Sequence, residues 1–236
     1  MSRKRTLAVL TAIVAFTLVI GVPATANQPG TYEVTIENLT TGQPLTPALV
    51  ATHRGNDGFF RVGKAASFGL KEIAENGNLG PMVTRIDNDR DFLNRVIKEG
   101  AGPPPILPGE TVTFEIEASA PFNFLSWASM LICTNDGFTG VNKVKLPSQV
   151  GKSVTLYTQG YDAGTEDNTE LFADIVPPCG PLTGQGMHTG SGMSDPLLAE
   201  GGVIHHHGGI TGDFDLDDAV NDWDNPVAVI TIERTG

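Results

Sequence analysis

Apolar and polar residues alternate along several short segments of the chain. In the first segment, Tyr32, Val34 and Ile36 alternate with polar neighbours, which is the period of a strand with one buried face. The same alternation recurs at residues 111–117, and apolar positions mark further strands at 153–157 and 227–233. Because Gly and Pro residues separate these segments, the pattern predicts an antiparallel β-sandwich.

A longer and almost wholly apolar segment, residues 122–133, predicts a strand that is buried on both faces. Helical spacing of apolar residues is limited to residues 66–76 and 90–99, which Gly77 and Gly100 follow as C-caps. The expected fold is therefore all-β, with one or two short helices inserted after the second strand. Residues 177–212 hold 10 of the 28 glycines, which predicts a long surface excursion before the last strand.

The N-terminus has the features of a secretory signal peptide. Arg3, Lys4 and Arg5 precede an apolar run at residues 7–22, and Ala24-Thr25-Ala26 follows as a cleavage site. The alternative is a retained membrane anchor, for which the apolar run is short. We expect residues 1–26 to be removed, so that residues 27–236 form a single domain without a membrane span. The expected location is secreted or extracellular, with the cell envelope or periplasm included.

Charge and cysteine content narrow the function classes. The formal net charge is −12, and removal of residues 1–26 makes it −15, so the surface lacks the excess of Lys and Arg that nucleic acid or anionic lipid requires. Cys133 and Cys179 are the only cysteines. In an oxidising compartment an even pair most simply forms one disulfide, which would stabilise the fold by about 3–4 kcal/mol.

Several segments in a fixed order carry a resemblance to a known family. They are residues 51–53 (ATH), 62–70 (VGKAASFGL) and 73–77 (IAENG), then 129–136 (SMLICTND) and 162–166 (DAGTE). Together they resemble the N-terminal domain of spondins of the F-spondin type, as found in secreted bacterial and archaeal proteins. Glu200-Gly201-Gly202 and residues 227–234 are similar to the C-terminal end of that family. The resemblance covers about residues 31–234.

The resemblance implies a C2-like antiparallel β-sandwich in an extracellular adhesion or matrix context. It also implies one bound Ca²⁺, held by three acidic positions on two neighbouring loops. Carried onto this chain, the positions are Asp136, Asp162 and Glu166. Glu166 stands where the family has Asp, and Asp167 beside it is an alternative ligand. The thrombospondin-type repeats of eukaryotic spondins are absent, so the partner stays an unknown extracellular protein or polysaccharide, and the oligomeric state stays open.

The positions of two acidic residues favour a Ca²⁺ site independently of the family resemblance. Asp136 and Asp162 each follow a predicted strand, so both carboxylates are expected at strand ends. If those ends adjoin, the carboxylates repel each other, and Ca²⁺, which prefers oxygen ligands, relieves the repulsion. The alternative is that these acidic residues simply occupy solvent-exposed turns.

Histidines offer two other hypotheses. His205-His206-His207, with His188 upstream, raises the prospect of a Zn²⁺, Cu²⁺ or Ni²⁺ site, although a solvated run of histidines is the favoured interpretation. His53 would serve a secreted hydrolase as a general base only with a nucleophile or a pocket, and a structural hydrogen-bonding role is favoured instead. The first hypothesis is therefore a secreted, non-enzymatic Ca²⁺-binding domain. A metal-dependent hydrolase and a transition-metal-binding protein are the alternatives.

Overall fold

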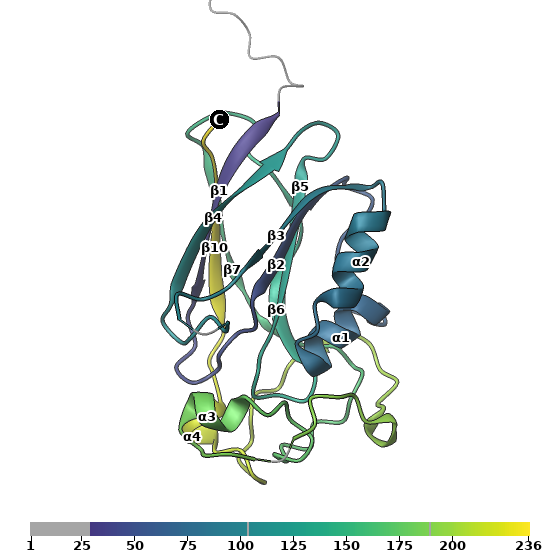
Figure 1. Ribbon diagram of the computed structural model, residues 1–236, viewed down its shortest axis with the longest axis vertical. Coiled ribbons are helices and arrows are strands. Elements are labelled where there is room, and N and C mark those ends of the chain that lie inside the picture. Colours follow the sequence, from purple (N-terminus) through teal and green to yellow (C-terminus); the bar gives the residue numbers. More distant parts are fainter. Residues whose placement is uncertain (1–28, 103, 189) are drawn as a thin grey trace, which may run out of the picture.

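Two antiparallel sheets packed face to face form the body of the molecule (Figure 1). The computed structural model describes residues 29–102, 104–188 and 190–236. The expected signal peptide, residues 1–26, therefore lies outside the described residues.

The smaller sheet has four strands in the order β4-β1-β10-β7. Its strands are β1 (Gly30–Asn38), β4 (Thr111–Ala118), β7 (Ser153–Thr158) and β10 (Ala228–Arg234). The larger sheet has six strands in the order β3-β2-β5-β6-β8-β9. Its strands are β2 (Ala48–His53), β3 (Phe92–Lys98), β5 (Phe124–Met130), β6 (Gly137–Lys145), β8 (Gly160–Asp162) and β9 (His205–His206). The predicted all-β sandwich is confirmed.

The main hydrophobic core lies between the two sheets. In β1 the alternation of the sequence becomes an alternation of burial, and Val34 and Ile36 are fully buried. They join Trp127 of β5 and Ile230 of β10 in one cluster. Burial of each such side chain contributes about 1.5–3 kcal/mol.

The strand predicted to be buried on both faces is β5. Its inward residues join the core between the sheets, and Ala128 belongs to a second cluster on the outer face of the larger sheet. Two helices, α1 (Phe68–Asn76) and α2 (Gly80–Asn88), cover that outer face (Figure 1). Ser67 is the N-cap of α1, because its Oγ accepts a hydrogen bond from the Leu70 amide, and Gly77, whose φ of 63° suits glycine, is the C-cap.

The prediction of a helix at residues 90–99 is wrong, because this segment forms the edge strand β3. Phe92 pairs with His53 and Asn94 pairs with Thr52, so Leu93 is an extra residue at a bulge. The bulge interrupts the two-residue alternation and leaves a spacing of apolar residues that is typical of a helix. The second helix is instead α2, which has Pro81 in its first turn and buries Met82 and Ile86.

The chain between β8 and β10 gathers at one end of the sandwich (Figure 1). This part contains α3 (Cys179–Thr183), a short 3₁₀ helix η1 (Pro196–Leu198), β9 and α4 (Asp218–Asn221). The predicted disulfide between Cys133 and Cys179 is present and ties α3 to the residues after β5. Among the described residues, no helix has the length and apolar character needed to cross a membrane.

Candidate metal centre

Three carboxylates meet where the loops gather at the end of the sandwich. Asp136 directly precedes β6, and Asp162 ends β8; because these strands pair with Gly137 opposite Asp162, the two acids are neighbours. Glu200 approaches from the glycine-rich segment. One carboxylate oxygen from each of the three residues lies within 4.8 Å of the other two. Both acids lie at strand ends, and the pairing of β6 with β8 makes these ends adjoin, which is the condition that the sequence argument for a cation required.

Asp136 is fully buried and only half satisfied. Its Oδ2 accepts hydrogen bonds from the Thr165 amide at 2.7 Å, the Thr165 hydroxyl at 3.0 Å and the Glu166 amide at 3.1 Å. Its Oδ1 is buried and has no hydrogen-bond partner in the described part of the chain. Burial, and then the negative charge of Asp162, raise the pKa of Asp136 to about 6.

Asp162 is buried and held in a fixed orientation. Its Oδ1 accepts a hydrogen bond from the Gly164 amide at 2.7 Å, and its Oδ2 accepts one from the Asn168 side chain at 2.7 Å. Gly164 has a φ of +69°, and a Cβ there would lie 2.6 Å from the Val203 nitrogen. The turn after β8 therefore requires glycine, and this turn sets the position of the carboxylate.

Glu200 is brought in by backbone pairing across the turn. The Gly202 amide donates to the Gly164 carbonyl at 2.8 Å, and the Glu200 amide donates to the Thr165 carbonyl at 3.4 Å. Burial, and then the charge of Asp162, raise the pKa of Glu200. Glu200-Gly201-Gly202 resembles the C-terminal end of the family, but no ligand role is expected for it from the sequence, since a glycine-rich segment 34 or more residues beyond Glu166 carries no signal of where it folds back.

Glu166, the third ligand expected from the sequence, does not belong to this group. Its Oε1 accepts a hydrogen bond from the Asp195 amide at 2.9 Å. Burial, and then the nearby charge of Glu75, raise its pKa to about 7. The backbone amide of Glu166 nevertheless supports the cluster by donating to Asp136. Asp167, the alternative ligand, is exposed and also lies outside the group.

His53 has the structural role favoured by the sequence analysis. The ring is fully buried, and its Nδ1 lies 2.6 Å from the Arg54 carbonyl while its Nε2 lies 2.8 Å from Ser126 Oγ. Burial lowers the pKa of His53. Each ring nitrogen therefore lies within hydrogen-bond distance of a partner, so both nitrogens are engaged.

The three consecutive histidines have three different environments. His205 is exposed, and its Nδ1 lies 3.0 Å from the Val203 carbonyl and 3.7 Å from Asp162 Oδ1. His206 is exposed and stacks on Tyr161. His207 is buried against Trp223, so the expected solvated run is wrong at this position. Within the described residues, the His residues do not join any group of three metal-ligating side chains.

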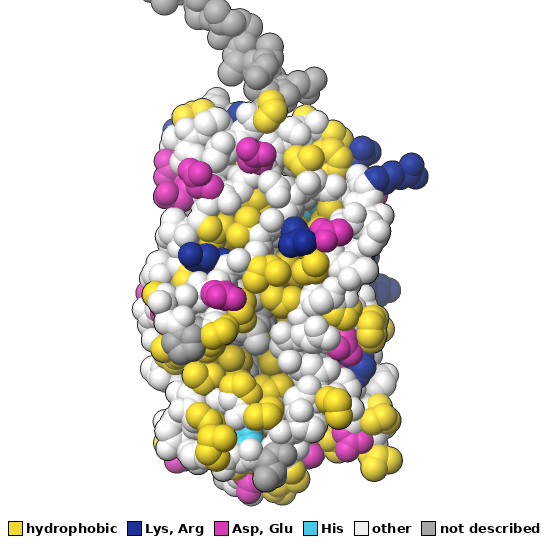
Figure 2. Space-filling model, in the orientation of Figure 1, with side chains coloured by type: hydrophobic (Ala, Val, Ile, Leu, Met, Phe, Trp, Pro, Cys, Tyr) yellow, Lys and Arg dark blue, Asp and Glu magenta, His cyan; other side chains and the backbone are white. Residues whose placement is uncertain are grey.

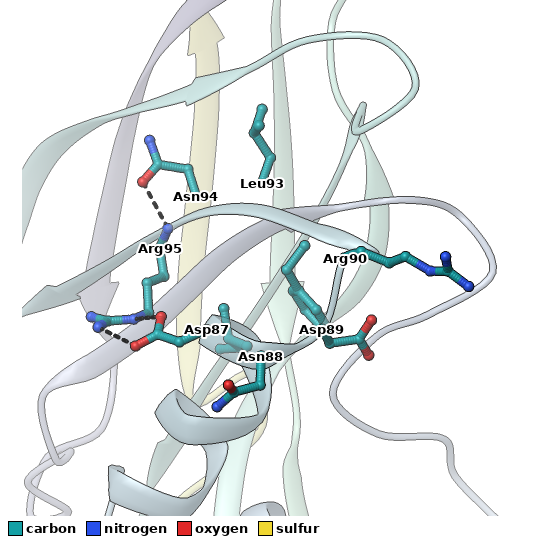
Figure 3. A pocket seen from close by; sticks show the side chains of 9 residues that line it. Asp87, Asn88, Asp89, Arg90, Leu93, Asn94 and Arg95 are labelled. Carbon is teal, nitrogen blue, oxygen red and sulfur yellow. Dashed lines mark hydrogen bonds and ion pairs between the residues drawn. The ribbon is translucent and has the colours of Figure 1, made fainter.

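In a second acidic group, Asp57, Asp89 and Asp91, two of the three acids have cationic partners. Arg85 pairs with Asp57, and Arg54 pairs with Asp91 at 3.4 Å. Near it, between α2 and β3, lies a cavity of about 670 Å³. Figure 3 shows that Arg95, which lines this cavity, points toward Asp87, to which it donates two hydrogen bonds of 2.7 and 2.8 Å. Asp57, Asp91 and Asp87 thus each face an arginine, which distinguishes both places from the cluster at Asp136.

The two sheets and the disulfide define a disulfide-linked β-sandwich domain, and the disulfide suggests an extracellular location because disulfides persist in oxidising compartments. The Spondin_N family model matches residues 37–174, more than half of the chain. The chain therefore belongs to the spondin N-terminal domain family, as the sequence motifs predicted. The match includes Asp136, Asp162 and Glu166 but ends before Glu200. No curated protein matches the sequence.

Proposed function

We propose that the protein is a non-enzymatic extracellular domain that binds one Ca²⁺ through Asp136, Asp162 and Glu200, and that it mediates contact with a surface or matrix component. The observation that carries the proposal is the environment of Asp136 Oδ1. Within the described residues this buried carboxylate oxygen has no hydrogen-bond partner, and Asp136 lies beside two further carboxylates. A buried charge without a partner is costly, and a divalent cation supplies the missing partner.

The donor set suits Ca²⁺ better than a softer metal. All three groups are carboxylates, the hard oxygen ligands that Ca²⁺ prefers, and three residues leave room for the carbonyls and waters that complete six to eight ligands. His205 offers an imidazole beside the cluster, but its Nδ1 is 3.7 Å from Asp162 Oδ1 and lies 3.0 Å from the Val203 carbonyl. Zn²⁺ or Cu²⁺ would favour several imidazole or thiolate ligands, so the transition-metal hypothesis has less support.

The hydrolase hypothesis also has less support. A general base needs a free nitrogen within reach of a substrate, whereas both ring nitrogens of buried His53 are engaged. A Ca²⁺ bound by the three carboxylates would instead stabilise the loops that carry them. The carboxylate cluster joins the loops after β5 and β8 to the glycine-rich segment, so that bound Ca²⁺ would fix the surface that this end of the sandwich presents.

Thermal unfolding with Ca²⁺ or EDTA tests the ligand set, with Glu200→Gln and Glu166→Gln as matched variants. At a free Ca²⁺ concentration ten times the Kd, wild type should gain about 1.4 kcal/mol, which raises Tm by about 3–6 °C. Glu200→Gln should lose most of this gain, and Glu166→Gln should keep it.

Each contrary outcome has a definite meaning. If Glu166→Gln loses the response and Glu200→Gln keeps it, Glu166 rather than Glu200 is the third ligand. If wild type gains nothing in millimolar Ca²⁺, the proposed site does not exist. A response to Zn²⁺ that disappears in His205→Ala would favour the transition-metal alternative.

A further inference from the structure

A cavity of about 500 Å³ gathers positive charge on an otherwise acidic molecule. Four Lys and Arg residues line it, together with Asp57 as the one acid. The four are Arg61, Lys64, Arg85 and Lys143. The described chain has 12 Lys and Arg residues against 27 Asp and Glu residues, so a third of its cations meet around one cavity. On the face drawn in Figure 2, by contrast, charged side chains lie in small separate groups.

A bulge between β5 and β6 builds one wall of this cavity. Ser126 faces both Asn142 and Lys143, since Leu125 pairs with Val144 and Trp127 pairs with Val141. Lys143 adopts a φ of +58°, which is unfavourable for a residue with a side chain. Ser126 Oγ compensates by accepting the Lys143 amide at 3.0 Å. The bulge thereby presents Asn142 and Lys143 to the cavity.

The opposite wall is held against the bulge by short contacts. Asn142 Oδ1 accepts the Phe59 amide at 2.8 Å, and a Cβ on Gly58 would lie only 2.2 Å from that same oxygen. Lys143 Nζ donates to the Asn56 carbonyl at 3.3 Å. The cavity is therefore preformed, which lowers the entropic cost of binding a ligand.

The positive charge of the cavity is not cancelled locally. Arg85 is paired with Asp57, and behind it Asp91 is paired with Arg54. Among the described residues, Arg61 and Lys64 have no ion-pair partner, and both are exposed. Ser67, the N-cap of α1, also lines the cavity and places the positive end of the helix dipole beside it. Such an arrangement attracts an anionic group.

The cavity continues into a second hollow of about 370 Å³, with which it shares Phe60, Arg61 and Asn142. Tyr157 and Tyr161 line this hollow, and Tyr157 is 68 % exposed. We call the two together the basic–aromatic groove. A large aromatic side chain left in solvent beside cations offers an apolar face next to charge.

We propose that the basic–aromatic groove binds an acidic polysaccharide, with its carboxylate or sulfate groups at Arg61, Lys64 and Lys143 and a sugar ring against Tyr157. A sugar ring has apolar C–H faces that pack on an aromatic ring, and hydroxyl groups that suit Asn56, Asn142 and Ser67. Arg and Lys bind the acidic groups. An acidic peptide would pair with the cations, but its carboxylate side chains would not pack on the exposed face of Tyr157 as a sugar ring does.

This inference rests on the proposed function only for its extracellular setting, because the groove shares no residue with the carboxylate cluster. The test is calorimetric titration of the full mature chain with polygalacturonate, dextran sulfate, neutral dextran and poly-L-glutamate, each in Ca²⁺ and in EDTA. The first two probes separate carboxylate from sulfate recognition. Wild type should bind at least one of them and should not bind neutral dextran.

Three variants make the test specific. Arg61→Ala/Lys64→Ala should weaken binding by about tenfold, and Tyr157→Ala should weaken it by about three- to tenfold without a change of charge. The matched control Arg90→Ala/Lys152→Ala removes one Arg and one Lys that lie outside the groove, and it should bind like wild type. All three variants should keep the Ca²⁺-dependent rise in Tm.

The inference is overturned by any of four results. They are no binding to either acidic polysaccharide, an equal loss in the control pair, full binding by Tyr157→Ala, and equally tight binding of poly-L-glutamate, which would indicate a protein partner. Failure here with an intact Ca²⁺ response leaves the proposed function standing. Loss of the Ca²⁺ response with intact polysaccharide binding would contradict the proposed function and leave the polysaccharide site standing.

Discussion

Replacing Asp136 with asparagine should stabilise the metal-free protein and remove its response to Ca²⁺. Asparagine keeps an oxygen for the three donors of Thr165 and Glu166. Its amide group would take the place of the unpartnered Oδ1 and donate toward the carboxylates of Asp162 and Glu200. The change therefore removes a buried, repelled charge without opening a cavity.

The size of the gain follows from the pKa of Asp136. Burial and Asp162 raise this pKa from 3.8 to about 6, and each unit corresponds to about 1.4 kcal/mol. Above pH 7 the charged Asp136 therefore costs the metal-free protein about 3 kcal/mol. Asp136→Asn should recover about that free energy of unfolding, which corresponds to a Tm rise of about 6–12 °C for a domain of this size.

The pH dependence has a definite sign. Because the folded-state pKa is higher than the unfolded-state pKa, the native protein holds more protons between pH 4 and 6. The Asp136 contribution to stability is thus present at about pH 4 and is lost as the pH rises toward about 6. The difference between Asp136→Asn and wild type should be near zero at pH 4 and complete at pH 7.5.

Urea unfolding in EDTA at pH 4 and 7.5, repeated in saturating Ca²⁺ at pH 7.5, measures both effects. Asp213→Asn is the matched control, since Asp213 is exposed at the same end of the molecule, and it should change stability by less than about 0.5 kcal/mol. A loss of stability in Asp136→Asn at pH 7.5 in EDTA would refute the reasoning, because the buried charge would then have a partner that asparagine cannot replace.

Two further predictions concern the scaffold. Cys133→Ala/Cys179→Ala should lower the free energy of unfolding by about 3–4 kcal/mol, mainly because the unfolded chain is freed; urea unfolding measures it, and reduction of wild type should give the same loss if the effect comes from the crosslink. Gly140→Ala should destabilise by about 2–4 kcal/mol, since its Cβ would lie 2.0 Å from the Trp127 carbonyl oxygen. The matched control is Gly208→Ala, because Gly208 is exposed, has no positive φ and has open space around its Cβ; an equal loss in the control would contradict the clash as the cause.

The sequence predicts strands best where alternation and burial coincide. β1, β4, β7 and β10 follow the two-residue period because each has one face on the core between the sheets. β6 carries Gly137 and Gly140, which weaken any strand signal. Gly140 is required there by the close approach of the Trp127 carbonyl from β5, and such a contact is not visible in the sequence.

The candidate site divides in the same way. Asp136 and Asp162 could be predicted because both stand at the ends of neighbouring strands, where local pattern fixes position. Glu200 could not, since its place depends on backbone pairing of Gly202 with Gly164 across 38 residues of chain. Glu166 has the right charge and spacing, but its side chain is drawn away by the Asp195 amide.

The most direct test of the central claim is calorimetric titration of Ca²⁺ into the metal-free protein, with Asp162→Asn as the comparison. Asp162 belongs to the proposed site, and its carboxylate is held in place because its two oxygens accept hydrogen bonds from the Gly164 amide and the Asn168 side chain. We predict one Ca²⁺ bound per chain by wild type, with at least a roughly tenfold weaker affinity in Asp162→Asn. Absence of Ca²⁺ binding in the millimolar range, or equal binding by both proteins, would contradict the account.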